Sequence, residues 1–315
     1  MENRPSAQNL NLLLQNLLPS TLSTVITEWL KEDLPSFDYG GYVVGNTQKV
    51  AILFAKANGV LAGVPFVNEI FHQLGCTVKW NYSEGDFLSV ETDTAAKNKS
   101  RIEVAQVTGP ANKLLLGERV ALNLLARCSG IATRARKLKN MGDEAGFKGV
   151  IAGTRKTTPG FRIVEKYGMS VGGIDNHRMD LSSMVMLKDN HIWAVGSIPS
   201  AVKAARSVCG FSMKIEVECQ SEEEAVLAAK SGADVVMLDN FSPNDLKIAA
   251  SSLRSRMNPS NSSDTFIPKV LIEASGGISE ATINQYFCEH IDIISMGDIT
   301  QGVPYIDFSL KIQQV

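Results

Sequence analysis

The stretch Gly149-Val-Ile-Ala-Gly-Thr-Arg-Lys-Thr-Thr-Pro-Gly160 decides how this chain is expected to fold. It opens with a short apolar run, which is typical of a buried strand. Two adjacent cations, three hydroxyl side chains and a Pro-Gly pair follow, so the polar residues come where the strand ends. The stretch therefore predicts a strand over residues 149–153 whose carboxyl end carries chemically useful groups.

The same arrangement recurs toward the C-terminus. Further apolar, β-rich runs alternate with helical segments and lie at residues 184–188, 214–218, 235–239, 270–274 and 291–296. Strands that alternate with helices form a parallel sheet, which is either open and doubly wound or curved into a barrel. Because polar residues follow nearly every strand, as at the catalytic face of (β/α) barrels, we predict an incomplete (β/α) barrel of about six parallel strands.

Helix starts are readable between these strands. Ser221 and Glu224 form a capping box, and Ser242 stands before a proline at the first helical position. Ser279 is expected to begin a helix before Cys288 in the same way. The polar run at residues 258–265 is expected to be a loop.

The first part of the chain does not show this regular alternation of strands and helices. Expected strands lie at residues 50–56, 77–82, 87–92 and 100–108, and expected helices lie at 10–18 and 22–34. After Gly109-Pro110, a long helical pattern runs from Glu118 to about Asn140. A chain of 315 residues suits about two domains. We therefore predict an α/β protein with an N-terminal α/β sandwich domain over residues 1–116 and the barrel over residues 117–315.

Composition argues against several classes of function. With 31 Lys and Arg against 33 Asp and Glu, the net charge of −2 argues against broad nucleic-acid binding, which requires a basic excess. No apolar run approaches the ~20 residues of a membrane span, and the Leu-rich start lacks the basic region of a signal peptide. The five cysteines contain no Cys-x-x-Cys pair, so no zinc or redox motif is suggested. A cytoplasmic protein is expected, with presence in the nucleus left open.

The residues at the expected strand ends fall into three chemical groups along the chain. Cations come first, namely Arg155, Lys156, Arg178 and Lys188, with His177 beside them. Two carboxylates follow, namely Glu218 and Asp239. Small residues come last, namely Ser275, Gly276, Gly277 and Gly297.

Each group suits one part of a reaction between anions. Arg recognises carboxylate or phosphate in a bidentate manner, and Lys adds a point charge. Paired carboxylates suit Mg²⁺, and glycine loops that lead into helix starts offer backbone N–H groups to a phosphate. Any one of these residues alone would be read as a surface charge, a salt-bridge partner or a turn. Their combination predicts an anionic substrate, a phosphorylated co-substrate and Mg²⁺.

Two neighbours of this set are candidates for supporting roles. Glu216 lies two residues before Glu218, so both side chains should point to the same side of the strand. A carboxylate inside the barrel would need a partner, and we expect one of the cations to supply it. His191 follows Lys188 closely enough to support the site from behind.

The motifs resemble those of the quinolinate phosphoribosyltransferase family. The segments that carry the resemblance are 117–123, 153–160, 177–178, 186–191, 216–218, 238–240 and 273–278, and residues 59–63 also fit. The likeness covers essentially the whole chain and is densest from 117 to 310. It implies a decarboxylating enzyme of NAD biosynthesis. Such an enzyme transfers phosphoribosyl from 5-phosphoribosyl 1-pyrophosphate to the ring nitrogen of quinolinate, giving nicotinate mononucleotide, pyrophosphate and CO₂.

The resemblance also implies an assembly and a role for each site residue. It implies a homodimer in which the N-terminal region of one subunit covers the barrel mouth of its partner, with further assembly to a hexamer expected. Arg119 would cross that interface to quinolinate, whose two carboxylates would be held by Arg155, His177, Arg178 and Lys188. Lys156 would face the pyrophosphate, Glu218 and Asp239 would bind the ribose hydroxyls and Mg²⁺, and these three residues would be catalytic. The 5′-phosphate would lie against Ser275, Gly276, Gly277 and Gly297.

Three other functions are weighed against this one. A related enzyme that uses nicotinate would have no CO₂ to lose, but the number of cations favours a dicarboxylate. A non-catalytic protein on the same fold would be expected to lack Glu218, Asp239 or the glycines, and all are present. An aldolase-like barrel would need a Schiff-base lysine; Lys188 could serve, but the surrounding arginines suit that chemistry poorly.

Overall fold

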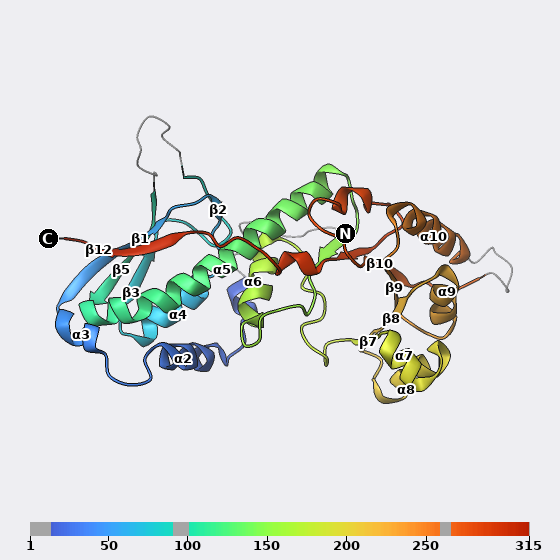
Figure 1. Ribbon diagram of the computed structural model, residues 1–315, viewed down its shortest axis with the longest axis horizontal. Coiled ribbons are helices and arrows are strands. Elements are labelled where there is room, and N and C mark those ends of the chain that lie inside the picture. Colours follow the sequence, from blue (N-terminus) through green and yellow to red (C-terminus); the bar gives the residue numbers. More distant parts are fainter. Residues whose placement is uncertain (1–13, 91–100, 259–265, 315) are drawn as a thin grey trace. The chain divides into compact units, whose positions relative to one another are not determined.

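The computed structural model describes residues 14–90, 101–258 and 266–314, and its chain forms two compact units (Figure 1). The first unit consists of Met1–Lys137, Thr158–Gly173 and Gly302–Val315. The second consists of Leu138–Thr157 and Ile174–Gln301. The chain therefore enters the second unit, returns to the first for one helix, and returns again at its C-terminal end.

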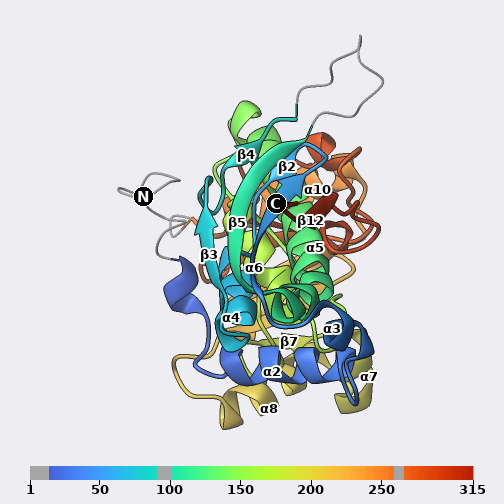
Figure 2. The ribbon, with the colours of Figure 1, turned by 90° about the vertical axis from the view of Figure 1, so that its left-hand side faces the viewer.

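The first unit is built on a four-stranded antiparallel sheet with the order β12-β1-β5-β3 (Figure 2). Its strands are β1 (Gln48–Ala55), β3 (Thr77–Trp80), β5 (Ile102–Pro110) and β12 (Phe308–Ile312). A smaller pair, β2 (Gly59–Val60) and β4 (Phe87–Leu88), lies in the same unit. Alternation of apolar and polar side chains along β5 explains why one face of the sheet is buried.

The first unit also contains helical segments. They are η1 (Gln15–Leu17), α2 (Leu22–Asp33), α3 (Tyr39–Val44), α4 (Val64–Gln73), α5 (Ala111–Glu144) and α6 (Arg162–Gly172). Apolar residues of α4 and α5 share one core with the sheet, and this core includes Phe66, Phe71 and Leu125. Burial of such large side chains contributes roughly 1.5–3 kcal/mol each to the hydrophobic stabilisation of this unit.

The second unit holds a six-stranded parallel sheet with the order β6-β11-β10-β9-β8-β7. Its strands are β6 (Val150–Ala152), β7 (Val185–Leu187), β8 (Ile215–Cys219), β9 (Val235–Asp239), β10 (Leu271–Ser275) and β11 (Ile293–Ser295). The helical segments of this unit are α7 (Asp189–Val195), α8 (Ile198–Val208), α9 (Glu222–Lys230), α10 (Pro243–Arg256), η2 (Ile283–Gln285) and η3 (Gly297–Ile299). Among the described strands β6 and β7 are not paired, so the barrel is incomplete.

The predicted fold class is confirmed, and each strand predicted for the barrel is present within a few residues. The helix predicted after Ser279 is wrong. The side chains of Ser279 and Thr282 hydrogen-bond to each other, and only the short 3₁₀ turn η2 follows. The predicted domain boundary between residues 116 and 117 falls inside α5. Residues 1–13, 91–100 and 259–265 are outside the described chain. The loop predicted at 258–265 lies there except for Asn258, and so does the first part of the helix predicted at 10–18, residues 10–13. The rest of that predicted helix contains only the short 3₁₀ helix at Gln15–Leu17.

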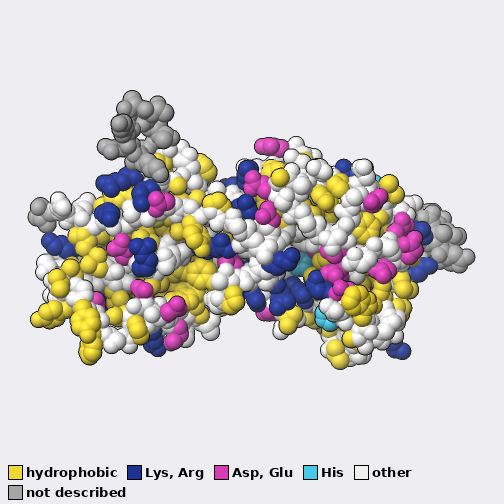
Figure 3. Space-filling view, in the orientation of Figure 1, with side chains coloured by type: hydrophobic (Ala, Val, Ile, Leu, Met, Phe, Trp, Pro, Cys, Tyr) yellow, Lys and Arg dark blue, Asp and Glu magenta, His cyan; other side chains and the backbone are white. Residues whose placement is uncertain are grey.

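Two surface properties bear on the function. No helix in the described ranges is long and apolar enough to cross a membrane. On the face drawn in Figure 3, acidic and basic side chains are interspersed, as expected for a net charge of −2.

Candidate active site

A pocket of about 510 Å³ lies at the carboxyl ends of the parallel strands in the second unit. Every predicted site residue except Arg119 lines it. Parallel strands place their carboxyl ends at one edge of the sheet, so residues that are more than 140 positions apart in the sequence meet there. The cations, the carboxylates and the small residues predicted from the sequence therefore line one cavity.

Arginines form one wall of the pocket. Arg155 follows β6, and its Nε atom is buried without a hydrogen-bond partner among the described residues. Arg178 donates from Nη1 to the Met184 carbonyl at 3.3 Å and from Nη2 to the Met186 sulfur at 3.4 Å. Burial, and then the positive charge of Arg155, lower the pKa of Arg178, while the Glu216 carboxylate acts in the opposite direction. Two partly buried guanidinium groups close enough to repel each other form a site for an anion.

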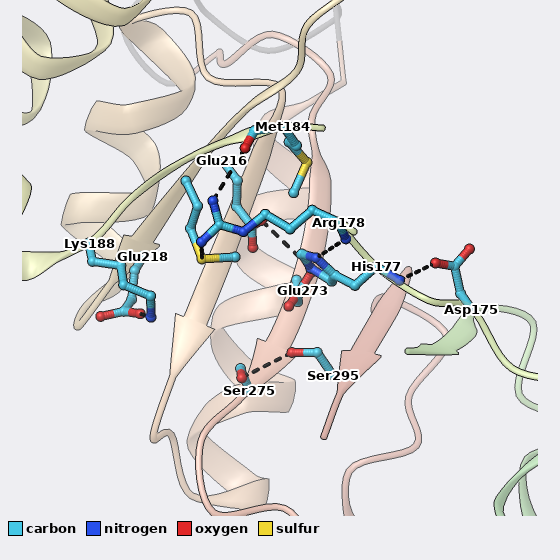
Figure 4. A network of polar contacts seen from close by, with 11 residues as sticks. Asp175, His177, Arg178, Met184, Lys188, Glu216, Glu218, Glu273, Ser275 and Ser295 are labelled. Atoms are coloured by element: carbon cyan, nitrogen blue, oxygen red, sulfur yellow. Dashed lines mark hydrogen bonds and ion pairs between the residues drawn. The ribbon is translucent and has the colours of Figure 1, made fainter. Parts of the chain in front are cut away.

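His177 has an unusual backbone and a fixed ring. Its φ of 53° lies in the left-handed region, which non-glycine residues rarely adopt. The Asp175 carboxylate accepts its backbone N–H at 2.6 Å, and its Nδ1 atom accepts the backbone N–H of Arg178 at 2.8 Å. Since Nδ1 is an acceptor, the ring proton is on Nε2, which donates to Glu273 at 3.0 Å (Figure 4).

Two glutamates lie beneath this ring, and the prediction singled out only one of them. Glu216 on β8 and Glu273 on β10 are both fully buried. Glu216 Oε2 lies 3.7 Å from His177 Nε2. Burial, and then the Glu273 carboxylate, raise the pKa of Glu216 well above its ordinary value, although Arg178 and Lys188 act against this. The periodicity of a strand could have identified Glu273, because alternate residues point to the same side of the sheet. Glu273 precedes Ser275 by two residues, as Glu216 precedes Glu218.

Lys188 and Glu218 form an ion pair in the pocket, at the ends of neighbouring strands. The Lys188 ammonium donates to Glu218 Oε2 at 2.5 Å (Figure 4). The backbone N–H of Lys188 donates to His191 Nδ1, so His191 caps the start of α7 behind the site. Glu218 is 9% exposed, whereas the Lys188 side chain is 45% exposed, so the lysine is the more accessible partner.

Asp239 lies next to Ser275 on the neighbouring strand, where small residues line the pocket. Asp239 accepts from the Asn240 and Gln220 amides. A Cβ atom at Gly276, which has φ +94°, would lie 2.5 Å from the Asn240 backbone nitrogen, so only glycine fits there. A Cβ atom at Gly297 would lie 2.8 Å from Lys156 Cδ. These glycines leave a concave surface at which a compact anion can approach the backbone.

Lys156 and Arg119 differ in their placement. Lys156 is exposed at the pocket, and its carbonyl oxygen accepts from the Thr300 hydroxyl at 2.6 Å, which fixes the backbone beneath its side chain. Arg119 is an exposed residue of α5 in the first unit and is not among the pocket residues. Its expected role at the site of a neighbouring subunit stays a prediction.

Two sets of residues could in principle hold a cation. Glu218 and Asp239 offer hard carboxylate oxygens in the same pocket, and this donor chemistry fits Mg²⁺. Ligand atoms of His177, Glu216 and Glu273 lie within 4.8 Å of one another. That second set fits a metal poorly, because Nε2 of His177 already carries a proton and Nδ1 accepts a backbone N–H.

Comparisons with known proteins agree with this site. The family model described as the quinolinate phosphoribosyl transferase C-terminal domain matches residues 131–311, and the N-terminal domain model of the same family matches residues 25–129. A nicotinate-nucleotide pyrophosphorylase [carboxylating] from Dictyostelium discoideum is 52% identical over 309 residues, covering 96% of this chain and 99% of that protein. The Homo sapiens protein with the same description is 49% identical and covers 97% of this chain and 95% of its own length.

A solved structure gives the same result. The nicotinate-nucleotide pyrophosphorylase from Francisella tularensis is 30% identical and superposes with a TM-score of 0.80 over 99% of this chain and 100% of its own. The two family models together match most of the chain, and its two units correspond to an antiparallel sheet domain and a partial barrel. The chain therefore belongs to the quinolinate phosphoribosyltransferase family.

Proposed function

We propose that this chain transfers the phosphoribosyl group of 5-phosphoribosyl 1-pyrophosphate to the ring nitrogen of quinolinate and releases CO₂, as a pentosyltransferase of NAD biosynthesis. The observation that carries the proposal is the arginine wall. Arg155 has a buried Nε without a partner among the described residues, and burial, followed by the positive charge of Arg155, lowers the pKa of the neighbouring Arg178. A dianion placed there would satisfy both guanidinium groups.

Quinolinate has two adjacent carboxylates, and the pocket offers enough donors for both. We assign Arg155, His177, Arg178 and Lys188 to this substrate, with Arg119 arriving from a second subunit. Lys188 donates to Glu218, so it would exchange this partner for a carboxylate of quinolinate or bridge the two. The ring nitrogens of His177 are both engaged within the protein, so its part in binding is to shape the wall beside Arg178.

The carboxylates, the small residues and Lys156 of the pocket suit the phosphoribosyl donor. The 5′-phosphate would lie against Ser275, Gly276, Gly277 and Gly297, where backbone N–H groups and the absence of Cβ atoms allow close approach. Asp239 and Glu218 would accept hydrogen bonds from the ribose hydroxyls. Lys156 would face the pyrophosphate from the edge of the pocket.

The chemistry follows from this placement. The pyridine nitrogen attacks C1 of the ribose as the bond to pyrophosphate breaks, so positive charge develops on the sugar ring and negative charge on the leaving group. Glu218 would stabilise the ring and Lys156 the leaving group. Once alkylated, the nitrogen is a pyridinium, and the carboxylate at position 2 leaves as CO₂ because the carbanion that forms is adjacent to the positive nitrogen. A proton then replaces it at that carbon.

Two further elements complete the proposal. Mg²⁺ held by Glu218 and Asp239, directly or through water, would neutralise pyrophosphate charge when bound. We propose a homodimer as the smallest active unit, as the family resemblance implies, in which the exposed Arg119 of one subunit reaches the dicarboxylate in the pocket of the other. Further assembly to a hexamer and a cytoplasmic location are also proposed.

The test compares two pyridine acids in the presence of 5-phosphoribosyl 1-pyrophosphate and Mg²⁺. Quinolinate is expected to give nicotinate mononucleotide and CO₂, whereas nicotinate, which has one carboxylate, is expected to react at least about a hundredfold less well because one buried cation then lacks its partner. Equal or better turnover of nicotinate, or no nucleotide from either acid, would overturn the proposal.

A further inference from the structure

We infer that Glu273, with Glu216 beside it, is a positioning residue that holds the segment His177-Arg178 in the geometry needed to bind the dicarboxylate. The inference deepens the proposed function and rests on it. Glu273 contacts the His177 ring rather than a reacting atom, so it acts through its neighbours.

The segment His177-Arg178 lies between two cavities. The first is the pocket described above. The second, of about 250 Å³, lies at the amino ends of the strands and is lined by Val150, Val235 and Leu271 among other residues. His177, Arg178 and Glu273 line both cavities. Packed side chains therefore do not hold the segment firmly from either side, and its position depends on its polar contacts.

Those contacts form a chain from the barrel wall to Arg178. Glu273 Oε2 accepts the Nε2 proton of His177, and Nδ1 of the same ring accepts the backbone N–H of Arg178 (Figure 4). The left-handed backbone of His177 is strained and persists only when its surroundings enforce it. Loss of the Glu273 acceptor would release the ring, and the backbone of Arg178 would lose its partner.

Glu216 explains how the Glu273 carboxylate can remain fully buried. Both oxygens of Glu216 and Oε1 of Glu273 are buried with no hydrogen-bond partner among the heavy atoms of the described residues. Two buried carboxylates with oxygens within 4.8 Å of each other are stabilised when they share one proton. Burial, and then the Glu273 carboxylate, raise the pKa of Glu216, so we place the proton on Glu216, from which it is donated to Glu273. The positive charges that face the pair are those of Arg178 and Lys188.

This division of roles predicts an asymmetry between amide substitutions. Glu216→Gln supplies an N–H donor where the proposal places a protonated carboxyl group, so the contact to Glu273 is kept. Glu273→Gln removes one of the two acceptor oxygens that the proposal requires. Glu273→Leu removes both. Asp292→Asn is a matched control, because Asp292 accepts from the Ile272 N–H next to Glu273 and pairs with Arg254, but is not among the residues that line either cavity.

The experiment measures steady-state kinetics for both substrates and the melting temperature of each variant. Glu273→Leu is expected to raise KM for quinolinate by at least about tenfold and KM for phosphoribosyl pyrophosphate by less than about threefold. Glu273→Gln is expected to give a smaller shift of the same kind, and Glu216→Gln the smallest. Asp292→Asn is expected to lower the melting temperature without separating the two KM values.

Several outcomes would overturn this role. Equal rises of both KM values, or an effect that follows melting temperature as in Asp292→Asn, would mean that Glu273 only supports the fold. A Glu216→Gln variant as impaired as Glu273→Leu would contradict the hydrogen-bond roles, and so would stoichiometric bound metal that Glu273→Gln removes. A wild-type chain without quinolinate turnover would instead overturn the proposed function and this role with it.

Discussion

Arg155 is the residue on which binding of a dicarboxylate depends most directly. We expect Arg155→Ala to lower kcat/KM for quinolinate by the equivalent of roughly 2–4 kcal/mol, as when one partner of a desolvated charge pair is truncated. Lys247→Ala on the exposed side of α10 removes a cation outside the pocket and is expected to have no effect. Steady-state kinetics check both, and an unchanged kcat/KM for Arg155→Ala would contradict the assignment.

Glu84 in the first unit is expected to make the stability of the protein depend on pH. Its two carboxylate oxygens accept the backbone N–H groups of Gly63 and Val64 at the start of α4. Burial raises the pKa of Glu84 to about 7, although these hydrogen bonds oppose the shift. The folded state therefore keeps a proton that the unfolded chain releases, so this group's contribution to stability falls as pH rises from about 4.5 through about 7.

We expect the free energy of unfolding of the wild type, relative to Glu84→Gln, to fall by roughly 2–3 kcal/mol between about pH 5 and about pH 8. Urea denaturation of both proteins at equal concentration measures it. Glu69→Gln on α4 should behave differently, because the Gln73 amide holds the pKa of Glu69 below its ordinary value. The contribution of Glu69 to stability is lost as pH falls below about 4.5, so this variant should show almost no pH dependence between about pH 5 and about pH 8. A difference for Glu84→Gln that does not change with pH would contradict the expectation.

Most of the pocket could be predicted at the residue scale because strand ends are readable in the sequence. A cation or carboxylate that directly follows an apolar run must lie at the carboxyl edge of the sheet, and this placed Lys188 and Asp239 correctly. Contacts between such residues could not be read. That Lys188 bonds to Glu218, and that Glu273 lies under His177, depends on how the sheet curves and on side-chain orientation.

At the scale of elements, α6 packs against α5 through glycines. A Cβ atom at Gly172 would lie 2.3 Å from the Ala135 Cβ and 2.7 Å from the Ala132 carbonyl oxygen, and one at Gly168 would lie 2.7 Å from the Cys128 carbonyl oxygen. The two helices approach closely enough for the Arg136 side chain to donate to the Val171 and Gly172 carbonyls at the end of α6. The approach has no room for a larger residue.

We therefore expect Gly172→Ala to lower the free energy of unfolding by roughly 1–3 kcal/mol, because the added methyl group forces the helices apart. Gly210→Ala is the matched control. A Cβ atom there meets nothing within 4 Å, and the change should stay within about 0.5 kcal/mol. Chemical denaturation of both variants tests this, and a fully stable Gly172→Ala protein would show that the helices can separate freely.

The elements differ in how well the sequence could foresee them. Strands β8 and β9 have apolar runs between clear turn signals, and their bounds were predicted almost to the residue. Strand β12 was not predicted. It pairs with β1, which lies about 250 positions earlier, and a short run beside an exposed Tyr305 carries no local sign of such a partner. The boundary between the two units, after Lys137, lies within the continuous helix α5. It could not be predicted, because no Gly-, Pro- or Ser-rich linker marks it.

At the scale of the whole molecule, the chain is slightly acidic, whereas its pocket is rich in positive charge. The chain carries a net charge of −2, yet its pocket gathers Arg155, Lys156, Arg178 and Lys188. Like charges in a partly desolvated cavity destabilise the folded state until an anion binds. The assembly that would bring Arg119 to such a pocket could not be derived from one chain's residues, because it depends on a second copy.

Quinolinate is therefore expected to stabilise the folded protein. A ligand at a hundred times its Kd adds about 2.7 kcal/mol, which raises the melting temperature by several degrees. Nicotinate at the same concentration should raise it less, because it has one carboxylate. Differential scanning fluorimetry with each acid measures the shifts, and a melting temperature unmoved by saturating quinolinate would count against the cation wall as its binding site.

The central claim concerns the fate of the two carboxylate carbons of quinolinate in one turnover. Quinolinate labelled separately at each carboxylate is incubated with the enzyme, 5-phosphoribosyl 1-pyrophosphate and Mg²⁺, and CO₂ and nucleotide are both collected. We expect the position-2 carbon to appear only in CO₂, the position-3 carbon to remain in nicotinate mononucleotide, and both products to form in equal amounts. Nucleotide that keeps both labelled carbons, or CO₂ released without the phosphoribosyl donor, would contradict the account.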